Sequence, residues 1–187
     1  MQVQSLEISD IKLITPRKHS DDRGFFSETY NVKAFEAAGV DAIFVQDNHS
    51  LSREKGVVRG LHYQIAPKAQ GKLVRVTRGS IFDVALDIRV GSPTFGQHVS
   101  AVLSAANWSQ LWIPVGFAHG FCTLEDNTEV QYKVTDDYAP DCDRGILWND
   151  PVLGIAWPVR AADVIISDKD RNQPSLRDAP VAFEISR

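Results

Sequence analysis

Residues 81–90 read Ile-Phe-Asp-Val-Ala-Leu-Asp-Ile-Arg-Val, in which apolar and polar side chains alternate over most of the length. Successive side chains of a β-strand point to opposite faces of a sheet, so an alternation with a period of two predicts a strand. One face is wholly apolar and the other carries charges, which predicts a strand with one face in the core and one in water. The apolar face holds Phe82, Val84, Leu86, Ile88 and Val90, and the polar face holds Asp83, Asp87 and Arg89.

Short apolar runs bounded by turn residues recur on both sides of this strand. Many short strands at such spacing predict an all-β fold, namely a β-sandwich, a jelly roll or a barrel. One short helix is expected at residues 32–38, with Asn31 as its N-cap and Gly39 at its end. Residues 19–23 are typical of a turn, and the segment from Trp148 onward should wrap around the barrel. Further strands are expected at residues 11–15, 24–30, 72–77, 99–103, 111–113, 121–124 and 129–135.

The chain has 187 residues and a mass of 20.8 kDa. This size suits one domain that spans residues 1–187, and no repeat or linker-like segment divides it. No apolar run approaches the roughly 18 residues that a membrane span needs, and no secretion signal is recognisable, so the expected location is the cytoplasm. A net charge of -4 argues against a nucleic-acid surface. Cys122 and Cys142 are expected to be free thiols.

A second strand-like run, residues 57–64, reads Val-Val-Arg-Gly-Leu-His-Tyr-Gln and holds the first candidate for chemistry. On a regular strand Arg59 would lie on one face, and Gly60 and His62 on the other. Gly60 would then leave space beside His62 for a ligand to approach. A single histidine on a strand is more often a hydrogen-bonded core residue than a catalytic one, so His62 needs supporting residues elsewhere in the chain.

Residues 114–121, Pro-Val-Gly-Phe-Ala-His-Gly-Phe, supply a second histidine, His119. This Pro-x-Gly-x-x-His arrangement resembles the second motif of the cupins, a superfamily of small β-barrels. Metal-binding cupins carry His-x-His and a downstream Glu in their first motif, whereas this chain has His62, Gln64 and then Lys72. An ammonium group repels a divalent cation, and an amide oxygen binds transition metals weakly. We therefore expect a cupin-like jelly-roll barrel that has no structural or catalytic metal. Proton transfer by side chains, described next, requires no redox or organic cofactor.

Three side chains, those of His62, Lys72 and Tyr132, together predict proton transfer. A neutral imidazole can accept a proton near pH 7, and an ammonium group can stabilise the negative charge left on an oxygen. A phenol can return a proton from the other side of a bound substrate. The set describes proton abstraction beside a carbonyl followed by reprotonation, which is racemisation, epimerisation or isomerisation. Taken singly, Tyr132 also fits a half-buried strand tyrosine, and Lys72 fits a solvated strand end.

An ordered set of sequence blocks closely resembles the dTDP-4-dehydrorhamnose 3,5-epimerases. The blocks run from about residue 10 to about residue 176 without large gaps. Each block is modest, but the ordered set is highly specific to that family. The blocks are Arg-Gly-Phe-Phe-Ser-Glu at 23–28, Phe-Val-Gln-Asp-Asn-His-Ser at 44–50, Arg-Gly-Leu-His-Tyr-Gln at 59–64, Gln-Gly-Lys-Leu-Val at 70–74, residues 82–89, Ser-Pro-Thr-Phe-Gly at 92–96, residues 111–121, Trp-Asn-Asp-Pro at 148–151 and Ser-Asp-Lys-Asp at 167–170.

The resemblance implies a cupin-like jelly roll that acts on dTDP-4-dehydro-6-deoxy-D-glucose in the route to dTDP-L-rhamnose. It implies that His62 is the general base and that Asp170 is the carboxylate paired with it. Asp168, two residues earlier, remains a rival for that pairing. Tyr132 matches the general acid of the family. The resemblance also implies a homodimer in which an extended N-terminal segment is exchanged between the two chains.

The remaining site residues come from the same resemblance. Lys72 and His119 would hold the sugar and stabilise the enolate, and Arg23 and Arg59 would lie near the diphosphate, where guanidinium groups suit an anion. Tyr138 would stack on the thymine ring. Asp143, another implied substrate contact, stands where the family more often has Glu, whose side chain is longer. The other implied substrate contacts are Phe26, Glu28, Gln46, Asn48 and Lys169.

Other functions stay open from the sequence. A mono-epimerase would keep the fold and invert only C3 or only C5, so that only the stereochemistry of the product separates the two activities. A cupin that binds a nucleotide or sugar without catalysis would be expected to lack the base or the acid, and this chain has both. A β-barrel without a site would not explain why so many polar side chains can face one cavity.

Overall fold

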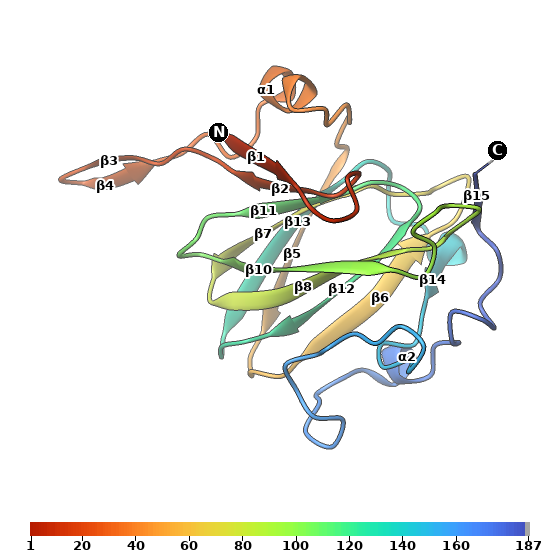
Figure 1. Cartoon of the computed structure of the whole chain (residues 1–187). Helices are drawn as coiled ribbons and strands as arrows, with labels where there is room; N and C mark the ends of the chain where they lie inside the picture. Colours follow the sequence, from red (N-terminus) through yellow and green to blue (C-terminus); the bar gives the residue numbers. More distant parts are fainter. Residues whose placement is uncertain (186–187) are drawn as a thin grey trace.

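Two antiparallel β-sheets packed face to face make up the body of the molecule in the computed structural model, which describes residues 1–185 (Figure 1). The all-β jelly roll predicted from the sequence is confirmed, although the strands form two layers over the described residues rather than one closed barrel. The six-stranded sheet has the order β1 (Gln2–Ser5), β2 (Lys12–Thr15), β11 (Gln110–Ile113), β7 (Lys72–Arg78), β13 (Thr128–Val134) and β5 (Gln46–Ser52). The five-stranded sheet has the order β10 (His98–Ser104), β8 (Ser80–Asp87), β12 (Phe117–Thr123), β6 (Val58–Gln64) and β14 (Asp143–Gly145).

Smaller elements surround the two sheets. The hairpin of β3 (His19–Asp21) and β4 (Gly24–Phe26) projects away from the body in Figure 1, and we call residues 18–28 the arm. The remaining elements are α1 (Val32–Ala37), the 3-10 helix η1 (Pro140–Cys142), α2 (Asp168–Arg171) and β15 (Phe183–Glu184), which pairs in parallel with β9 (Arg89–Val90).

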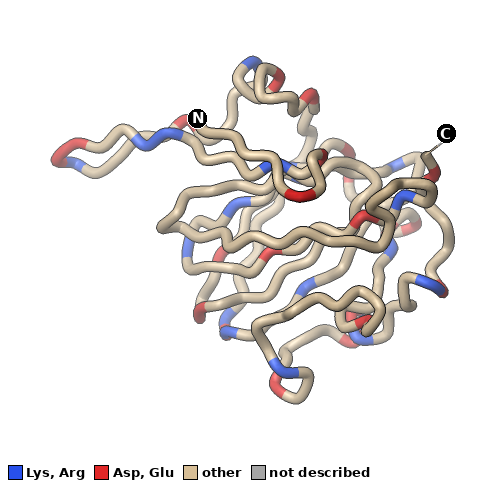
Figure 2. The backbone as a smooth tube through the Cα atoms, in the orientation of Figure 1, with Lys and Arg blue, Asp and Glu red and all other residues tan. Residues whose placement is uncertain are grey.

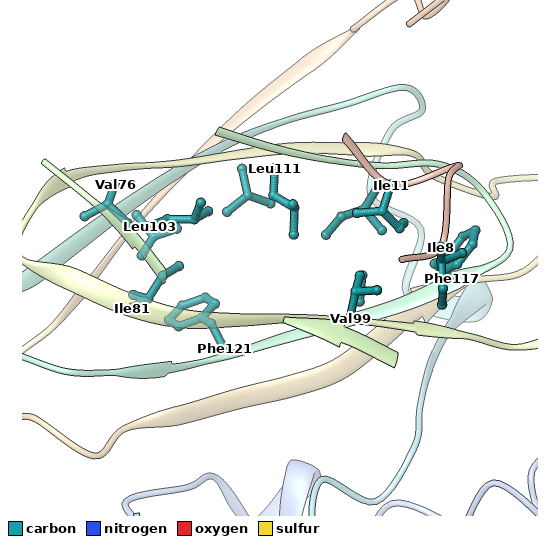
Figure 3. Close-up of a cluster of buried hydrophobic side chains, with 13 residues drawn as sticks. Ile8, Ile11, Val76, Ile81, Val99, Leu103, Leu111, Phe117 and Phe121 are labelled. Carbon is teal, nitrogen blue, oxygen red and sulfur yellow. The ribbon is translucent and has the colours of Figure 1, made fainter. Parts of the chain in front are cut away.

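The space between the sheets is filled by apolar side chains from both layers, as Figure 3 shows. Val76 and Leu111 come from the six-stranded sheet, and Ile81 and Phe121 come from the five-stranded sheet. Burying a side chain of this size contributes roughly 1.5–3 kcal/mol relative to leaving it in water. This core holds the two layers together on the side of β8, β10 and β11.

The predicted division of β8 into a buried and a wet face is wrong. Asp83 and Asp87 are both 0% exposed, and Asp83 lies on the same side of the strand as Ile81 in the core between the sheets. The apolar side chains of Val84 and Leu86 point the other way, into a second cluster outside the sandwich. The sequence pattern identified two faces, but the charged one faces inward.

The second cluster exists because the C-terminal segment covers the outer face of the five-stranded sheet. Leu153, Trp157, Leu176 and Phe183 pack against the outward side chains of β6, β8 and β12. In Figure 1 this segment runs along the lower side of the molecule and carries α2. The predicted wrap is therefore confirmed, and β6, β8 and β12 are covered on both faces, whereas Ser100 and Val102 on the outer face of β10 stay exposed.

Several local predictions are confirmed with small shifts of their bounds. The helix covers Val32–Ala37, and the Asn31 side chain accepts a hydrogen bond from the Ala34 amide as its cap. Strand β12 begins four residues earlier than expected because Phe117 and Ala118 are buried on opposite faces of their sheet. Residues 19–23 form one limb and the tip of a hairpin instead of a simple turn. Cys122 and Cys142 are free thiols.

Charged residues of both signs are spread over the strands, the loops and the tip of the arm (Figure 2). Positions of the two signs are intermixed along the chain in this view, which agrees with the small net charge of -4. Among residues 1–185, no helix has the length and apolar character needed to cross a membrane.

Candidate active site

A polar cleft lies at the side of the sandwich where β5 and β13 face β6 and β14. It has two adjoining parts of about 260 and 270 Å³, and His62, Lys72, Tyr132 and Lys169 line both. The first part is also lined by Ser50, Arg59, His119, Phe121, Ser167 and Asp170. The second part is also lined by Gln46, Asn48, Tyr63, Gln64, Gln70, Tyr138 and Asp143.

Size alone does not locate the site. A larger hollow of about 650 Å³ lies beneath the C-terminal segment, and its walls are mainly apolar. The carboxylate of Asp150 in that hollow already accepts hydrogen bonds from the backbone amides of Val152 and Leu176. The cleft between the sheets is smaller, but it gathers the titratable side chains that proton transfer requires.

An irregularity in β6 determines which side chains enter the cleft. His119 pairs with His62 and Phe121 pairs with Arg59, so β6 has one more residue than β12 between these two pairs. The extra residue breaks the alternation, and Arg59 and His62 both line the cleft instead of facing opposite ways. The prediction that Arg59 lies on the other face from His62 is therefore wrong.

Gly60 lies at this irregularity, and the space beside it is not a ligand path. A Cβ atom there would meet the Gly120 Cα atom at 2.6 Å and the His119 carbonyl oxygen at 2.7 Å. The backbone of β12 thus occupies the room that the glycine leaves. The Gly60 amide donates a hydrogen bond of 3.1 Å to the Asp170 carboxylate. This glycine therefore helps to hold Asp170 in place.

His62 and Asp170 form a close pair. The His62 Nε2 atom lies 2.6 Å from Asp170 Oδ1, and Asp170 is 4% exposed. Asp170 sits in α2, whose N-cap Ser167 accepts a hydrogen bond from the Asp170 amide. The rival Asp168 is exposed and makes no contact with His62.

The environment of Asp170 keeps its carboxylate ionised. Burial alone would raise the pKa of this group, but the hydrogen bond from His62, the charge of the imidazole, the Gly60 amide and the nearby Lys169 together lower it. An ionised Asp170 orients the imidazole and stabilises the imidazolium that forms when His62 takes a proton.

Lys72 enters the cleft from β7 in the six-stranded sheet. Its Nζ atom donates to the His62 carbonyl oxygen at 3.2 Å. Burial lowers the pKa of Lys72 to about 8, although the charges of Asp143 and Asp83 act in the opposite direction. The predicted alternative of a solvated strand end is wrong, because Lys72 is only 9% exposed.

His119 forms a second histidine–carboxylate pair. Its Nε2 atom lies 2.7 Å from Asp83 Oδ1, and burial is the main cause that lowers the pKa of His119. The other oxygen of Asp83 has no hydrogen-bond partner among the described residues. The sequence analysis placed Asp83 in water, so this residue of the site was missed. Two aspartates four residues apart in an otherwise apolar strand were the signal.

Tyr132 faces His62 across the cleft. It lies on β13 in the six-stranded sheet, whereas His62 lies on β6 in the five-stranded sheet, and both line both parts of the cleft. Burial raises the pKa of the Tyr132 phenol, so the hydroxyl keeps its proton at neutral pH. A basic imidazole and a protonated phenol thus approach one space from opposite walls.

Comparison with known proteins identifies the family. A family model described as dTDP-4-dehydrorhamnose 3,5-epimerase matches residues 5–178. This chain belongs to that family. A dTDP-4-dehydrorhamnose 3,5-epimerase of Sinorhizobium fredii is 55% identical over 184 residues, which cover 98% of this chain and 94% of the relative.

Solved structures of a 3,5-epimerase and of a monoepimerase share the fold. An epimerase of Legionella pneumophila, solved in complex with dTDP-4-keto-L-rhamnose, is 44% identical, with a TM-score of 0.94 over 100% of this chain and 99% of that one. A 3'-monoepimerase of Streptomyces bikiniensis, solved with dTDP-quinovose, is 34% identical, with a TM-score of 0.85 over 92% of this chain and 86% of that one.

Besides Lys72, five of the residues that resemblance to the epimerase family assigned to substrate binding lie together in the second part of the cleft. The Tyr138 hydroxyl donates to Asp143 Oδ2 at 3.2 Å, and Lys169 forms an ion pair with the same carboxylate. Gln46 donates to Asn48 at 2.8 Å and accepts a hydrogen bond from the Tyr138 amide. The shorter Asp143 side chain therefore still reaches its neighbours.

Three other assigned residues lie away from the cleft of their own chain. Arg23, Phe26 and Glu28 belong to the arm, which projects from the body (Figure 1). The side chain of Arg23 is 90% exposed and pairs with Asp21, and Phe26 is 70% exposed. A single chain does not bring these residues to the site.

Six residues that line the cleft were not among the predicted site residues, namely Ser50, Tyr63, Gln64, Gln70, Phe121 and Ser167. Ser50 and Phe121 enter the cleft by strand alternation, and Ser167 enters as the cap of α2. Gln64 is buried, and it holds the loop after β13 by donating to the Asp137 carbonyl and accepting from the Ala139 amide. Residues 1–185 contain no group of three or more His, Cys, Asp or Glu side chains placed to hold a metal ion.

Proposed function

We propose that this chain inverts C3 and C5 of dTDP-4-dehydro-6-deoxy-D-glucose and so produces dTDP-4-dehydro-L-rhamnose for dTDP-L-rhamnose synthesis. The observation that carries the proposal is the placement of the His62–Asp170 pair and Tyr132 on opposite walls of one cleft. Membership of the epimerase family and the close likeness to an epimerase solved with dTDP-4-keto-L-rhamnose support it.

The chemistry begins with removal of a proton beside the C4 ketone. Because His62 Nε2–H donates to Asp170, the Nδ1 atom carries the lone pair that takes the proton from carbon. The electron pair of the broken C–H bond moves into the ring and places negative charge on the ketone oxygen. We assign the stabilisation of this enolate to the Lys72 ammonium, with His119 held beside it by Asp83.

Inversion is completed when Tyr132 gives its phenolic proton to the opposite face of the same carbon. His62 then returns its proton to water, and Tyr132 regains one from water, so that no net proton is consumed. C3 and C5 both flank the ketone, so one base and one acid can treat each centre in turn. We assign Arg59, at the mouth of the cleft, to the diphosphate, and Tyr138 with Gln46, Asn48, Asp143 and Lys169 to the nucleotide end of the substrate.

The second candidate is inversion at one centre only. The likeness to a 3'-monoepimerase keeps this candidate in view, because such an enzyme shares the fold. The higher identity of 55% to a 3,5-epimerase favours inversion at both centres.

An NMR assay in deuterated water tests the function directly. The purified protein is incubated with dTDP-4-dehydro-6-deoxyglucose, and the signals at C3 and C5 are followed while a reductase traps the product. We expect deuterium at both carbons, and a trapped sugar that is dTDP-L-rhamnose, formed by reduction of the L-lyxo ketone. Exchange at one carbon would establish a mono-epimerase, and exchange at neither would leave a binding protein or a different substrate.

Activity should fall as the pH rises through about 8, the pKa of Lys72 in the free protein. The ammonium form of Lys72 is present below that pH and is lost above it, and only the charged form stabilises an enolate. The midpoint of this fall should lie near pH 8 for kcat/KM. It should lie at a higher pH for kcat, because the anionic substrate favours the charged form of Lys72. Lys72→Met should lower activity and remove its fall above about pH 8. A fall in this pH range that persists in Lys72→Met would contradict the assignment.

We further propose that residues 1–187 form one domain and that two chains form a homodimer. The two apolar clusters share the five-stranded sheet, which supports one folding unit. The arm supports the dimer, because Arg23 and Phe26 are exposed in one chain and can complete the cleft of a second chain. Free Cys122 and Cys142 suit a reducing compartment, so a cytoplasmic location is part of the proposal.

A further inference from the structure

Trp108, in the turn between β10 and β11, packs against the arm. Its ring packs edge-on against Phe25 with centroids 5.0 Å apart, and its Nε1 atom donates to Ser27 Oγ at 2.9 Å. The Nζ atom of Lys18 lies 4.1 Å from the centroid of the Trp108 ring and 4.5 Å from that of Phe25. Lys18 belongs to the incoming limb of the arm and Phe25 to the outgoing limb, so one indole contacts both.

The backbone at Trp108 is held in an unfavourable conformation. Its φ angle is 61°, in the left-handed region where a bulky side chain costs of the order of 1 kcal/mol or more. The Asn107 side chain supports this turn by accepting hydrogen bonds from the amides of Ser104 and Ser109. A small residue would suit the turn better, so the presence of tryptophan is explained by what its ring contacts.

The arm has little other support. All six residues of β3 and β4 are exposed, and two paired strands alone are at best marginally stable in water. Because neighbouring side chains of a strand point to opposite faces, Phe25 on the Trp108 ring directs Phe26 away from the body. The packing of Trp108 against Phe25 therefore determines the direction in which the Phe26 side chain points.

We propose that Trp108 is a positioning residue for substrate binding in the cleft of the neighbouring protomer. By holding Lys18, Phe25 and Ser27, it fixes the rotation of the arm so that Phe26 meets the nucleotide end of that cleft. The inference rests on the proposed function, since it requires that the arm be exchanged in a homodimer. Trp108, which does not line the cleft of its own chain, thus affects the affinity of the neighbouring protomer for the nucleotide sugar.

The first test separates binding from chemistry. Trp108→Ala should raise KM for the nucleotide sugar by about tenfold, through loss of the aromatic and cation–π contacts, and leave kcat close to that of the parent protein. Trp108→Phe keeps a ring for Phe25 and Lys18 and should recover most of the loss. Lys18→Met is a milder second variant with a smaller rise in KM. A fall in kcat with KM unchanged in these variants would overturn the proposal.

The second test asks in which chain Trp108 acts. A Trp108→Ala chain and a His62→Ala chain are co-expressed with different tags, and the mixed dimer is purified on both. Its one working cleft has His62 from the first chain and faces an arm held by the intact Trp108 of the second. We expect the KM of the parent protein in this dimer and a raised KM in the Trp108→Ala homodimer.

A raised KM in the mixed dimer would show that Trp108 acts within its own chain and would overturn the proposal. A sedimentation mass of one chain would overturn it as well. Failure of the proposed epimerase activity is distinguishable from both outcomes, because the parent protein would then lack epimerisation before any variant is made.

Discussion

Replacing His62 with alanine should stop deuterium exchange at both C3 and C5 and lower kcat/KM by about a thousandfold, within the range that a general base supplies. Both centres should fail together because we assign one imidazole, which lies 2.6 Å from Asp170, as the base for each of them. The measurement is the NMR assay in deuterated water, with circular dichroism to confirm that the variant is folded. Exchange that persists at either carbon would assign the base for that carbon to another group.

Tyr132→Phe is the matched control for His62→Ala, because it changes the opposite wall of the cleft. The base and its carboxylate remain, so deuterium should still enter the substrate from the His62 side. Inversion should fall, since the phenol that reprotonates the other face is absent. Exchange without inversion in this variant and no exchange in His62→Ala together separate the acid from the base.

Replacing Gly60 with alanine should lower the free energy of unfolding by about 3 kcal/mol, from the sum of backbone strain and overpacking. The φ angle of Gly60 is +119°, and an added Cβ atom would lie 2.6 Å from the Gly120 Cα atom. A backbone atom cannot move aside as a side chain can, so β6 and β12 must separate. For a chain of this length the midpoint of thermal unfolding should fall by roughly 6–12 °C.

Alanine variants of two other glycines measure the contributions of backbone strain and steric clash separately. Gly24 has a similar φ angle of +133° and nothing within 4 Å of an added Cβ, so Gly24→Ala measures strain alone. Gly120→Ala measures the clash alone, because its Cβ would meet the Arg59 carbonyl oxygen at 2.8 Å without a left-handed φ angle. Gly60→Ala should be less stable than either variant. If Gly60→Ala lost no more free energy of unfolding than Gly24→Ala, the separation of β6 and β12 would have no energetic cost.

Much of the fold was predictable, because strand alternation and turn residues are local properties. The orientation of β8 was not, because the sequence does not say what covers each face. Val84 and Leu86 are buried by a segment that begins some sixty residues later, so the charged face of Asp83 turns toward the interior. Periodicity distinguishes two faces, and only tertiary packing decides which one meets the other sheet.

The site was predicted through residues whose chemistry is distinctive, such as His62, Lys72 and Tyr132. Sequence spacing did not decide between Asp168 and Asp170, since that choice depends on the turn of α2 that Ser167 caps. The placement of Arg59 depended on one extra residue in β6, which the pairing with β12 imposes. Such features arise between segments and have no local signature.

The distance along the chain between His62 and Asp170 also affects when activity can arise during synthesis. The two partners are 108 residues apart, and the carboxylate belongs to the segment that covers the outer sheet face. A nascent chain therefore carries the base long before the group that orients it has left the ribosome. Any product that stops short of residue 167 lacks Asp170 and leaves part of that apolar face bare, which invites aggregation. Epimerisation is therefore expected only from chains that extend past Asp170, because shorter products lack the carboxylate that pairs with His62.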